Sequence, residues 1–137
     1  MSDLVRFGVS LNSELLKKFD EHIKQHSYTN RSNAIADIIR DKLIEDEWTS
    51  NEIVTGVITM VFDHHQRELT NNLTNIQHDH HELIISSQHI HLDHDNCFEI
   101  IVVKGRANEL TVLCNKLKAA KGVKHAKLSL ATTGEKI

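Results

Sequence analysis

The chain has 137 residues, 39% of them hydrophobic and 26% charged, which is an ordinary balance for a folded soluble domain. No apolar run approaches the roughly 18 residues of a membrane span, and the first residues lack the basic and apolar blocks of a signal peptide, so we expect a cytoplasmic protein with no membrane partner. The formal net charge of −3 excludes a chain that is basic throughout, so any surface for nucleic acid must be a local patch.

The first part of the chain is expected to form one strand and two helices. Residues 4–11 alternate as a strand does, with Arg6, Gly8 and Ser10 on one face. Apolar residues at helical spacing follow in two blocks, which predict a short first helix and a second helix over about residues 30–48.

Such a small unit cannot bury enough apolar surface alone. A lone strand also leaves its backbone donors and acceptors unpaired. Both problems are solved if two chains pair their strands antiparallel and pack their helices together, so the sequence predicts an obligate dimer. A two-stranded ribbon of this kind fits the major groove of B-form DNA and can present alternate side chains to base edges.

After a polar connector at residues 49–52, the pattern predicts strand, helix, strand, strand, helix and strand. We expect these elements over residues 53–62, 65–78, 83–92, 97–103, 107–121 and 123–130. This order is the ferredoxin-like plan, with one antiparallel sheet and two helices on one face. The other face must be covered, and oligomerisation would do so. We expect an α+β protein whose residues 131–137 form a loose tail.

Two histidines and a cysteine suggest a metal site. His89 and His91 lie two residues apart in a predicted strand, so they project from one face. If residues 93–96 form a hairpin turn, Cys97 returns beside them. Two imidazoles and a thiolate suit nickel, copper or zinc better than magnesium or calcium. The other cysteine, Cys114, lies on an apolar helical stripe and is expected to be a core residue.

The residues alone leave the fourth ligand open, because His78, His80 and His81 lie close together in the sequence. Four protein ligands would leave no open position for a substrate or water, as a catalytic metal requires. The chain also lacks a His-Glu-x-x-His helix. We therefore expect neither an enzyme nor a small-molecule substrate.

Several motifs together resemble one known family over nearly the whole chain. They lie at residues 5–11, 28–35, 63–69, 77–78, 88–99 and 121–125. The most specific is His89-x-His91-x5-Cys97. The chain resembles the nickel-responsive transcriptional regulators (NikR), which implies a homotetramer. Its two intertwined ribbon-helix-helix dimers would flank a core of four ferredoxin-like (ACT-type) metal-binding domains. The domains implied are 1–48 for DNA binding, 49–52 as a linker and 53–137 for metal binding and tetramerisation.

The resemblance also implies a ligand set for one Ni(II) per subunit, in a square-planar site of three nitrogens and one sulfur. His89, His91 and Cys97 would come from one subunit, and His78 from the helix of a facing subunit. Glu99 shares a strand face with Cys97 and resembles the acid that orients these ligands in the family.

For DNA, the resemblance implies that Arg6, Gly8 and Ser10 face the major groove. Gly8 departs from the Thr or Ser usual in the family. The start of the second helix favours a phosphate through its N–H groups and dipole. The residues there are Asn30, Arg31 and Ser32.

Eight of the eleven histidines fall between His64 and His94, and five of these, together with His125, are candidates for secondary metal sites. These candidates are His64, His65, His80, His81, His94 and His125. Asp37 occupies a position associated with a cation site between domains in the family, whereas Asn33 replaces the Glu that is usual there.

The function implied is nickel-dependent control of transcription. Nickel would raise the affinity for a palindromic operator in double-stranded DNA and so control genes for nickel uptake or nickel enzymes. One alternative is a regulator of the same architecture for copper, zinc or cobalt. Another is a histidine-rich metal storage or delivery protein, which would bind several metals per chain and no specific DNA sequence.

Overall fold

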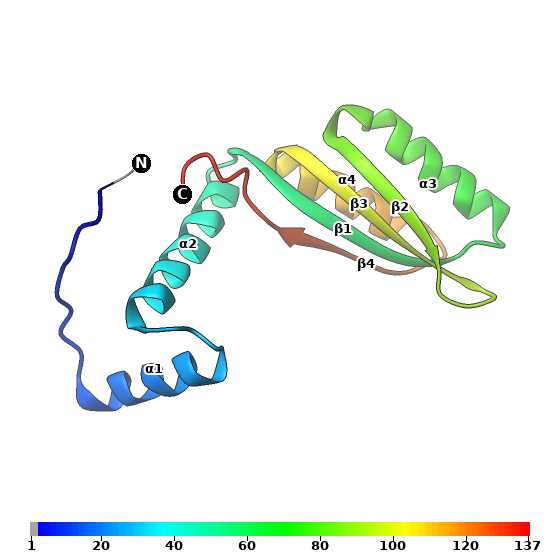
Figure 1. Ribbon diagram of the computed structural model, residues 1–137. Coiled ribbons are helices and arrows are strands. Elements are labelled where there is room, and N and C mark those ends of the chain that lie inside the picture. Colours follow the sequence, from blue (N-terminus) through cyan, green and yellow to red (C-terminus); the bar gives the residue numbers. More distant parts are fainter. Residues whose placement is uncertain (1–2) are drawn as a thin grey trace. The chain divides into compact units, whose positions relative to one another are not determined.

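The computed structural model describes residues 3–137, which form two compact units, the first up to Arg40 and the second over Asp41–Ile137. Helix α2 (Arg31–Thr49) contributes residues to both (Figure 1). Within the described residues, no helix is long and apolar enough to cross a membrane.

In the first unit, hydrogen bonds cap the two helices locally. The side chain of Asn12 accepts a 2.8 Å bond from the N–H of Leu15 at the start of α1 (Ser13–Gln25). The side chain of Asn30 does the same for the N–H of Asn33 at the start of α2, at 2.9 Å. Asparagine is a strong N-cap residue, because its side-chain oxygen accepts from an N–H that the helix itself leaves unpaired.

The strand predicted over residues 4–11 is not formed within the single chain. Residues 3–12 belong to no helix or strand and pair with no other described segment. Their apolar side chains are open to solvent, with Leu4 83%, Val5 79% and Phe7 71% exposed. The physical reason is that a strand requires a neighbour for its backbone groups, and the alternating pattern alone supplies none.

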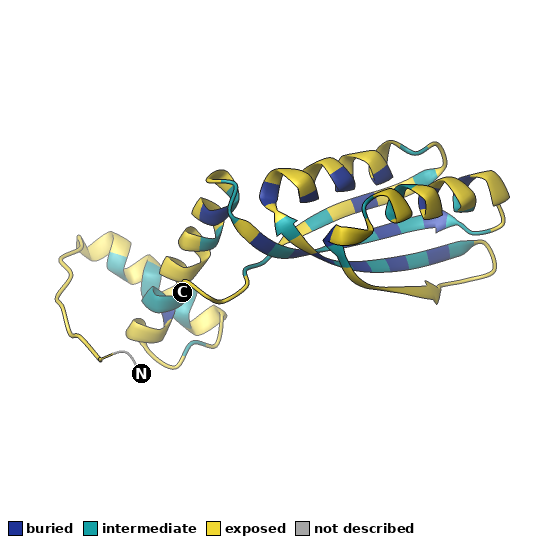
Figure 2. Ribbon diagram, turned by 90° about the horizontal axis from the view of Figure 1, so that it is seen from above, coloured by how far each residue is buried: buried dark blue, intermediate teal, exposed yellow. Residues whose placement is uncertain are grey.

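The second unit is a four-stranded antiparallel sheet with two helices on one face (Figure 2). Along the chain its elements are β1 (Ile53–Asp63), α3 (Arg67–Asp79), the 3-10 helix η1 (His81–Leu83), β2 (Ile84–His91), β3 (Asn96–Arg106), α4 (Ala107–Ala119) and β4 (Val123–Leu130). The strands lie in the order β2-β3-β1-β4, and each neighbouring pair is antiparallel. The predicted α+β class is confirmed in this unit.

Strict alternation of buried and half-buried residues along β1 and β3 separates the two faces of the sheet. Val54, Ile58 and Met60 of β1 are buried on the side of the helices, where Leu73 of α3 and Leu113 of α4 close the core. The opposite face of these two strands is only half-buried.

Helix α3 begins later than the sequence predicts. The carboxylate of Asp63 accepts a 2.9 Å hydrogen bond from the N–H of His65, and this local turn delays the helix to Arg67. His64 and His65 therefore lie in a turn between β1 and α3 instead of on the helix.

The end of the chain is bound to the second unit, so the prediction of a loose tail over residues 131–137 is wrong. The indole N–H of Trp48 donates a 2.9 Å hydrogen bond to the carbonyl of Ala131. The hydroxyl of Thr132 lies 3.1 and 3.2 Å from the two carboxylate oxygens of Glu47. Because Glu47 is only 7% exposed, this hydroxyl supplies a partner that a buried carboxylate needs.

Candidate metal centre

The hairpin of β2 and β3 carries the histidines and the cysteine that the spacing singles out. In its antiparallel register His89 lies opposite Glu99, and His91 lies opposite Cys97. Residues directly opposite each other in an antiparallel pair project from the same face. The structure therefore places these four side chains on one face of the sheet, at the outer strand β2 and its neighbour.

The turn between these strands is held by one carboxylate. Asp93 accepts hydrogen bonds from the backbone N–H groups of Asp95 (2.9 Å) and Asn96 (2.8 Å). The side-chain amide of Asn96 also donates to it, and these bonds hold the pKa of Asp93 below its ordinary value. The turn lies where the sequence predicts it, and it fixes the register that sets His91 opposite Cys97.

The sulfur of Cys97 lies 3.8 Å from Nδ1 of His89. Cys97 is 2% exposed, and its burial raises the pKa of the thiol, with the nearby charge of Glu99 acting in the same direction. The side chain of His89 is 56% exposed. A soft sulfur donor and an imidazole nitrogen thus meet where a metal ion could reach them and displace the thiol proton.

Glu99 is the charged residue beneath this pair, and it is only 1% exposed. Its Oε1 accepts a 2.9 Å hydrogen bond from the side chain of Gln77 and lies 3.4 Å from Nε2 of His89. Its Oε2 has no hydrogen-bond partner among the described residues. A buried carboxylate with an unsatisfied oxygen is costly unless positive charge lies near it. The unsatisfied carboxylate of Glu99 beside His89, whose ring lies next to the Cys97 sulfur, therefore favours a divalent metal ion at this pair.

His91 and His78 are less closely gathered than His89 and Cys97. The ring of His91 lies 4.6 Å, between centroids, from that of His64 in the turn before α3. His78 lies in the last turn of α3. Among the described residues, none of the four predicted ligands belongs to a group of three or more ligand atoms within 4.8 Å of one another.

Comparison with known proteins decides the family. Residues 55–131 match the family described as the NikR C terminal nickel binding domain. A protein of Syntrophus aciditrophicus is 56% identical over 98% of each chain. One of Solibacter usitatus is 51% identical over 98% of this chain and 97% of its own. Both carry the name "putative nickel-responsive regulator". The chain belongs to the nickel-responsive regulator family.

One solved structure outside such close relatives shares the fold. An uncharacterized protein of Thermotoga maritima superposes with a TM-score of 0.53 at 18% identity, covering 58% of this chain and 98% of its own. At such low sequence identity, the structural similarity shows a shared fold and nothing more.

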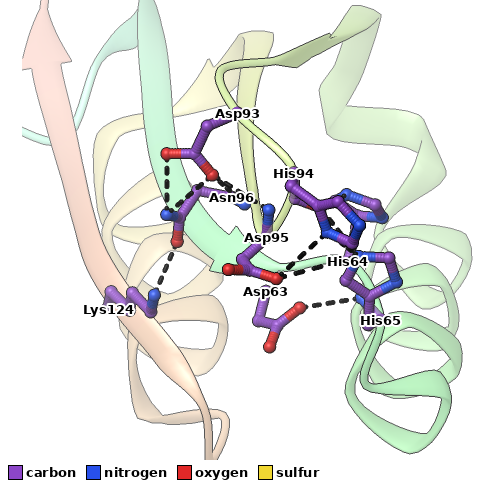
Figure 3. A network of polar contacts seen from close by, with 8 residues as sticks. All are labelled: Asp63, His64, His65, Asp93, His94, Asp95, Asn96 and Lys124. Atoms are coloured by element: carbon purple, nitrogen blue, oxygen red, sulfur yellow. Dashed lines mark hydrogen bonds and ion pairs between the residues drawn. The ribbon is translucent and has the colours of Figure 1, made fainter.

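In this family member, the structure also gathers a second group that the spacing did not reveal. Ligand atoms of His65, His94 and Asp95 all lie within 4.8 Å of one another (Figure 3). His65 and His94 were candidates for a secondary site, but Asp95 was not. The sequence does place Asp95 directly after His94 in the predicted turn. It does not show that this turn lies beside His65, because that requires the pairing of β1 with β3.

His64 adjoins this group, because its Nε2 lies 3.0 Å from the carbonyl oxygen of His94. The other four secondary candidates lie apart from it. His80 contacts Lys116, with 3.2 Å between Nε2 and Nζ, and Nδ1 of His81 lies 3.8 Å from the carboxylate of Glu82. The carboxylate of Asp37 accepts a hydrogen bond from the hydroxyl of Tyr28. His125 lies on β4, opposite Val61 of β1. None of these four candidates belongs to a three-ligand group among the described residues.

The residues predicted to contact DNA are exposed in the first unit. Arg6, Gly8 and Ser10 lie in the segment before α1, and Asn30 and Ser32 lie at the start of α2. The sixth, Arg31, is engaged within the chain. Its guanidinium donates two 2.9 Å hydrogen bonds to Asp20 of α1 and holds the pKa of that carboxyl below its ordinary value.

Proposed function

We propose that the chain is a nickel-responsive transcriptional regulator that holds one Ni(II) per subunit. The ligands would be His89, His91 and Cys97 of one subunit and His78 of a facing subunit. The observation that carries the proposal is the 3.8 Å approach of His89 to the buried Cys97 sulfur. The orphaned oxygen of Glu99 beside this pair supports it. A bound nickel ion would supply positive charge next to this buried carboxylate.

The proposed assembly is a tetramer in which ribbon-helix-helix dimers flank a core of ferredoxin-like (ACT-type) domains. Residues 1–48 would form the DNA-binding domain, and residues 49–52 would link it to the second domain. Residues 53–137 would bind the metal and form the centre of the tetramer. The open apolar side chains of residues 3–12 support pairing with a second chain, because a ribbon needs two strands. The half-buried second face of the sheet supports a tetrameric core.

In the ribbon of this dimer, Arg6, Gly8 and Ser10 would face the major groove. Arginine can bond guanine through two N–H groups, and serine can donate or accept. Asn30, Arg31 and Ser32 would lie against the phosphate backbone at the start of α2, where N–H groups and the helix dipole favour an anion. The palindromic operator would follow from the two-fold symmetry of the dimer.

Thermodynamic linkage would couple nickel binding to DNA binding. Ligands contributed by two subunits bind one ion best in a single quaternary arrangement, and so nickel stabilises that arrangement. If the same arrangement sets the spacing of the DNA-binding dimers, nickel raises the affinity for the operator. Control of genes for nickel uptake or nickel enzymes would follow.

The metal site is tested by nickel titration of the full chain, followed by equilibrium dialysis and ultraviolet-visible absorption. Cys97→Ser is the variant, and Cys114→Ser is the matched control, since Cys114 is also buried but lies on α4. We expect wild type and the control to bind a nickel ion tightly and to show a thiolate charge-transfer band, and we expect that band to be lost with Cys97→Ser. An unchanged band in Cys97→Ser would refute the ligand assignment.

The regulatory step is tested by selecting duplexes from a random DNA library with and without nickel. We expect nickel-dependent enrichment of a palindrome by wild type and its loss with His89→Ala. The same nickel dependence in His89→Ala would overturn the mechanism. Several tight metals per chain without any enriched sequence would favour a storage or delivery protein, and tighter, DNA-activating binding of copper, zinc or cobalt would favour a regulator for that metal.

A further inference from the structure

The connector from α2 to β1, residues 50–52, is bonded through its backbone to two helices, α2 and α4. Its three N–H groups donate to carbonyls in the last turn of α2: Ser50 to Asp46 at 2.9 Å, Asn51 to Trp48 at 3.2 Å and Glu52 to Glu47 at 3.0 Å. Two of its carbonyls accept from the start of α4, where the guanidinium of Arg106 bonds Asn51 at 3.3 Å and the N–H of Ala107 bonds Glu52 at 3.1 Å. A connector paired in this way resists bending, because a change of angle breaks hydrogen bonds.

The side chain of Asn51 also caps α4, although the two lie far apart in the sequence. Its Oδ1 accepts a 2.9 Å hydrogen bond from the N–H of Asn108, in the first turn of the helix. Arg106, the residue at the N-cap position, makes no side-chain cap bond, so Asn51 takes that role. The φ angle of Asn51 is +54°, a left-handed conformation that asparagine adopts more readily than most residues. Asparagine therefore suits both the backbone at this position and the contact with α4.

Residues 131–136 hold the connector and the end of α2 against β1. Besides the bonds of Trp48 and Glu47 described above, three 2.9 Å hydrogen bonds hold this segment: from the N–H of Ala131 to the carbonyl of Thr55, from the hydroxyl of Thr55 to the carbonyl of Thr132, and from the ammonium of Lys136 to the carboxylate of Glu52. The ring of Trp48 lies over Gly56 of β1, where an added Cβ would lie 3.4 Å from the indole. The last turn of α2 is thus packed on the sheet as well as bonded to it.

From these contacts we propose that residues 50–52 form a rigid joint, so that the end of α2, the start of α4 and residues 131–136 move as one body with the sheet. Hinges are usually a few loop or element-terminal residues, and a polar connector is where one is expected. The hydrogen bonds on both sides of this connector exclude that role. The joint rests on the proposed function in one respect: through it nickel would act on α2, which carries residues proposed to contact DNA.

Strand β3 connects this joint to the metal centre. Cys97 is its second residue and Arg106 is its last. The strand pairs with β1 over its whole length and with β2 from Cys97 to Val103. Because a strand paired on both sides is stiff, a displacement of Cys97 would be transmitted to Arg106 and, through the bond of its guanidinium, to Asn51. A small change at the metal centre would then reach α2 without being absorbed by a flexible linker.

The joint itself is tested by hydrogen exchange of the full chain, measured by nuclear magnetic resonance. We expect the amides of Asn51, Glu52 and Asn108 to be protected at least about a hundredfold relative to an unfolded chain. Asn51→Gly keeps the backbone angle but removes the cap, so exchange at Asn108 should become about fivefold faster. Asn51→Asp is the matched control, because aspartate also caps helices and should keep the protection. Unprotected connector amides in wild type would overturn the joint.

The coupling is tested with a palindromic duplex enriched by the nickel-dependent selection described above. For each variant, DNA affinity is measured with and without nickel, and the thiolate band is recorded to show that the metal site is occupied. Asn51→Gly should keep the band, while the gain in DNA affinity caused by nickel falls at least about fivefold. Thr132→Val removes the hydroxyl that bonds Glu47 and should also lower this gain. Thr133→Val is its control, since the hydroxyl of Thr133 accepts from Glu135 in its own segment.

An unchanged gain in both Asn51→Gly and Thr132→Val would overturn the role of the joint. An equal loss of the gain in Asn51→Asp and Thr133→Val would also overturn it, since neither of these variants breaks the joint. Failure of the proposed function would show differently, as wild type whose connector amides are protected but whose DNA binding does not respond to nickel.

Discussion

The two units of the chain differ in what they bury. In the second unit sixteen residues from the sheet, α3, α4 and η1 form one hydrophobic core. In the first unit, Ala34 is the one buried side chain among the described residues, while Phe7 and its apolar neighbours are exposed. The second unit therefore carries its own source of stability, whereas the first has apolar residues whose burial requires another surface. Alternating apolar residues therefore form buried strands in the second unit, whereas the same pattern in residues 4–11 stays exposed within the single chain.

The sharpest test of this contrast is the same substitution in both units. Phe62, which is 2% exposed, lies in the core of the second unit, and Phe7 is 71% exposed in the first. We expect Phe62→Ala to lower the free energy of unfolding of the second unit by about 3–5 kcal/mol. Trp48 reports on that unit during urea unfolding, because its indole is bonded to Ala131.

Phe7→Ala should leave the Trp48 transition in place and instead lower the mass of the assembly in analytical ultracentrifugation. If Phe7→Ala shifted the urea midpoint as far as Phe62→Ala does, the first unit would be stabilised within the chain and the contrast would fail.

A second prediction separates metal affinity from stability at Glu99. Glu99→Gln keeps the shape and the acceptor for Gln77 but removes the buried charge whose Oε2 lacks a partner. We expect nickel affinity to fall about 10–100-fold, as for other groups that orient metal ligands. The metal-free second unit should be as stable as wild type or more stable, since a costly buried charge is lost. Loss of stability on urea unfolding together with unchanged nickel affinity would contradict this role.

A third prediction concerns pH. Burial raises the pKa of the Cys97 thiol above its ordinary value of 9.0, so the thiol is protonated near neutral pH and nickel must displace that proton. Because each bound nickel ion displaces one thiol proton, the apparent nickel affinity should rise about tenfold for each unit of pH increase below that pKa. Calorimetry in two buffers of different ionisation enthalpy would count the protons released. Wild type should release one more than Cys97→Ser, and an equal count would exclude the thiolate as a ligand.

The smallest effect is expected at the ion pair of the first unit, where Asp20 engages Arg31. Asp20→Asn should free the guanidinium, so binding to DNA should tighten slightly with a steeper dependence on salt. Arg31→Ala should have the opposite effect, measured by fluorescence anisotropy over a range of salt concentrations. Since the folded pKa of Asp20 is lowered, the pair stabilises the fold above the unfolded pKa, and this stabilisation is lost as pH falls through the folded value.

The parts of the fold and of the metal centre that could be predicted depend on patterns between residues close together in the sequence. The strands and helices of the second unit follow from residue periodicity, and one turn at Asp93 suffices to place His91 opposite Cys97. The group of His65, His94 and Asp95 depends instead on the register of β1 against β3, which joins segments about thirty residues apart. No local pattern encodes that register. The residues alone also left the fourth ligand open, because His78, His80 and His81 lie close together in the sequence and a ligand from another subunit, as proposed, would leave no spacing signal within one chain.

The bound C-terminal segment has a practical consequence for protein engineering. Trimming the chain before Ala131 would remove the acceptor of the Trp48 indole, and would leave the buried Glu47 without the hydroxyl of Thr132. A shortened protein made to ease crystallisation would thus lose stability where α2 ends. A polyhistidine tag would add competing imidazoles to any nickel assay. A cleavable, histidine-free fusion beyond Ile137 leaves both the segment and the metal count intact.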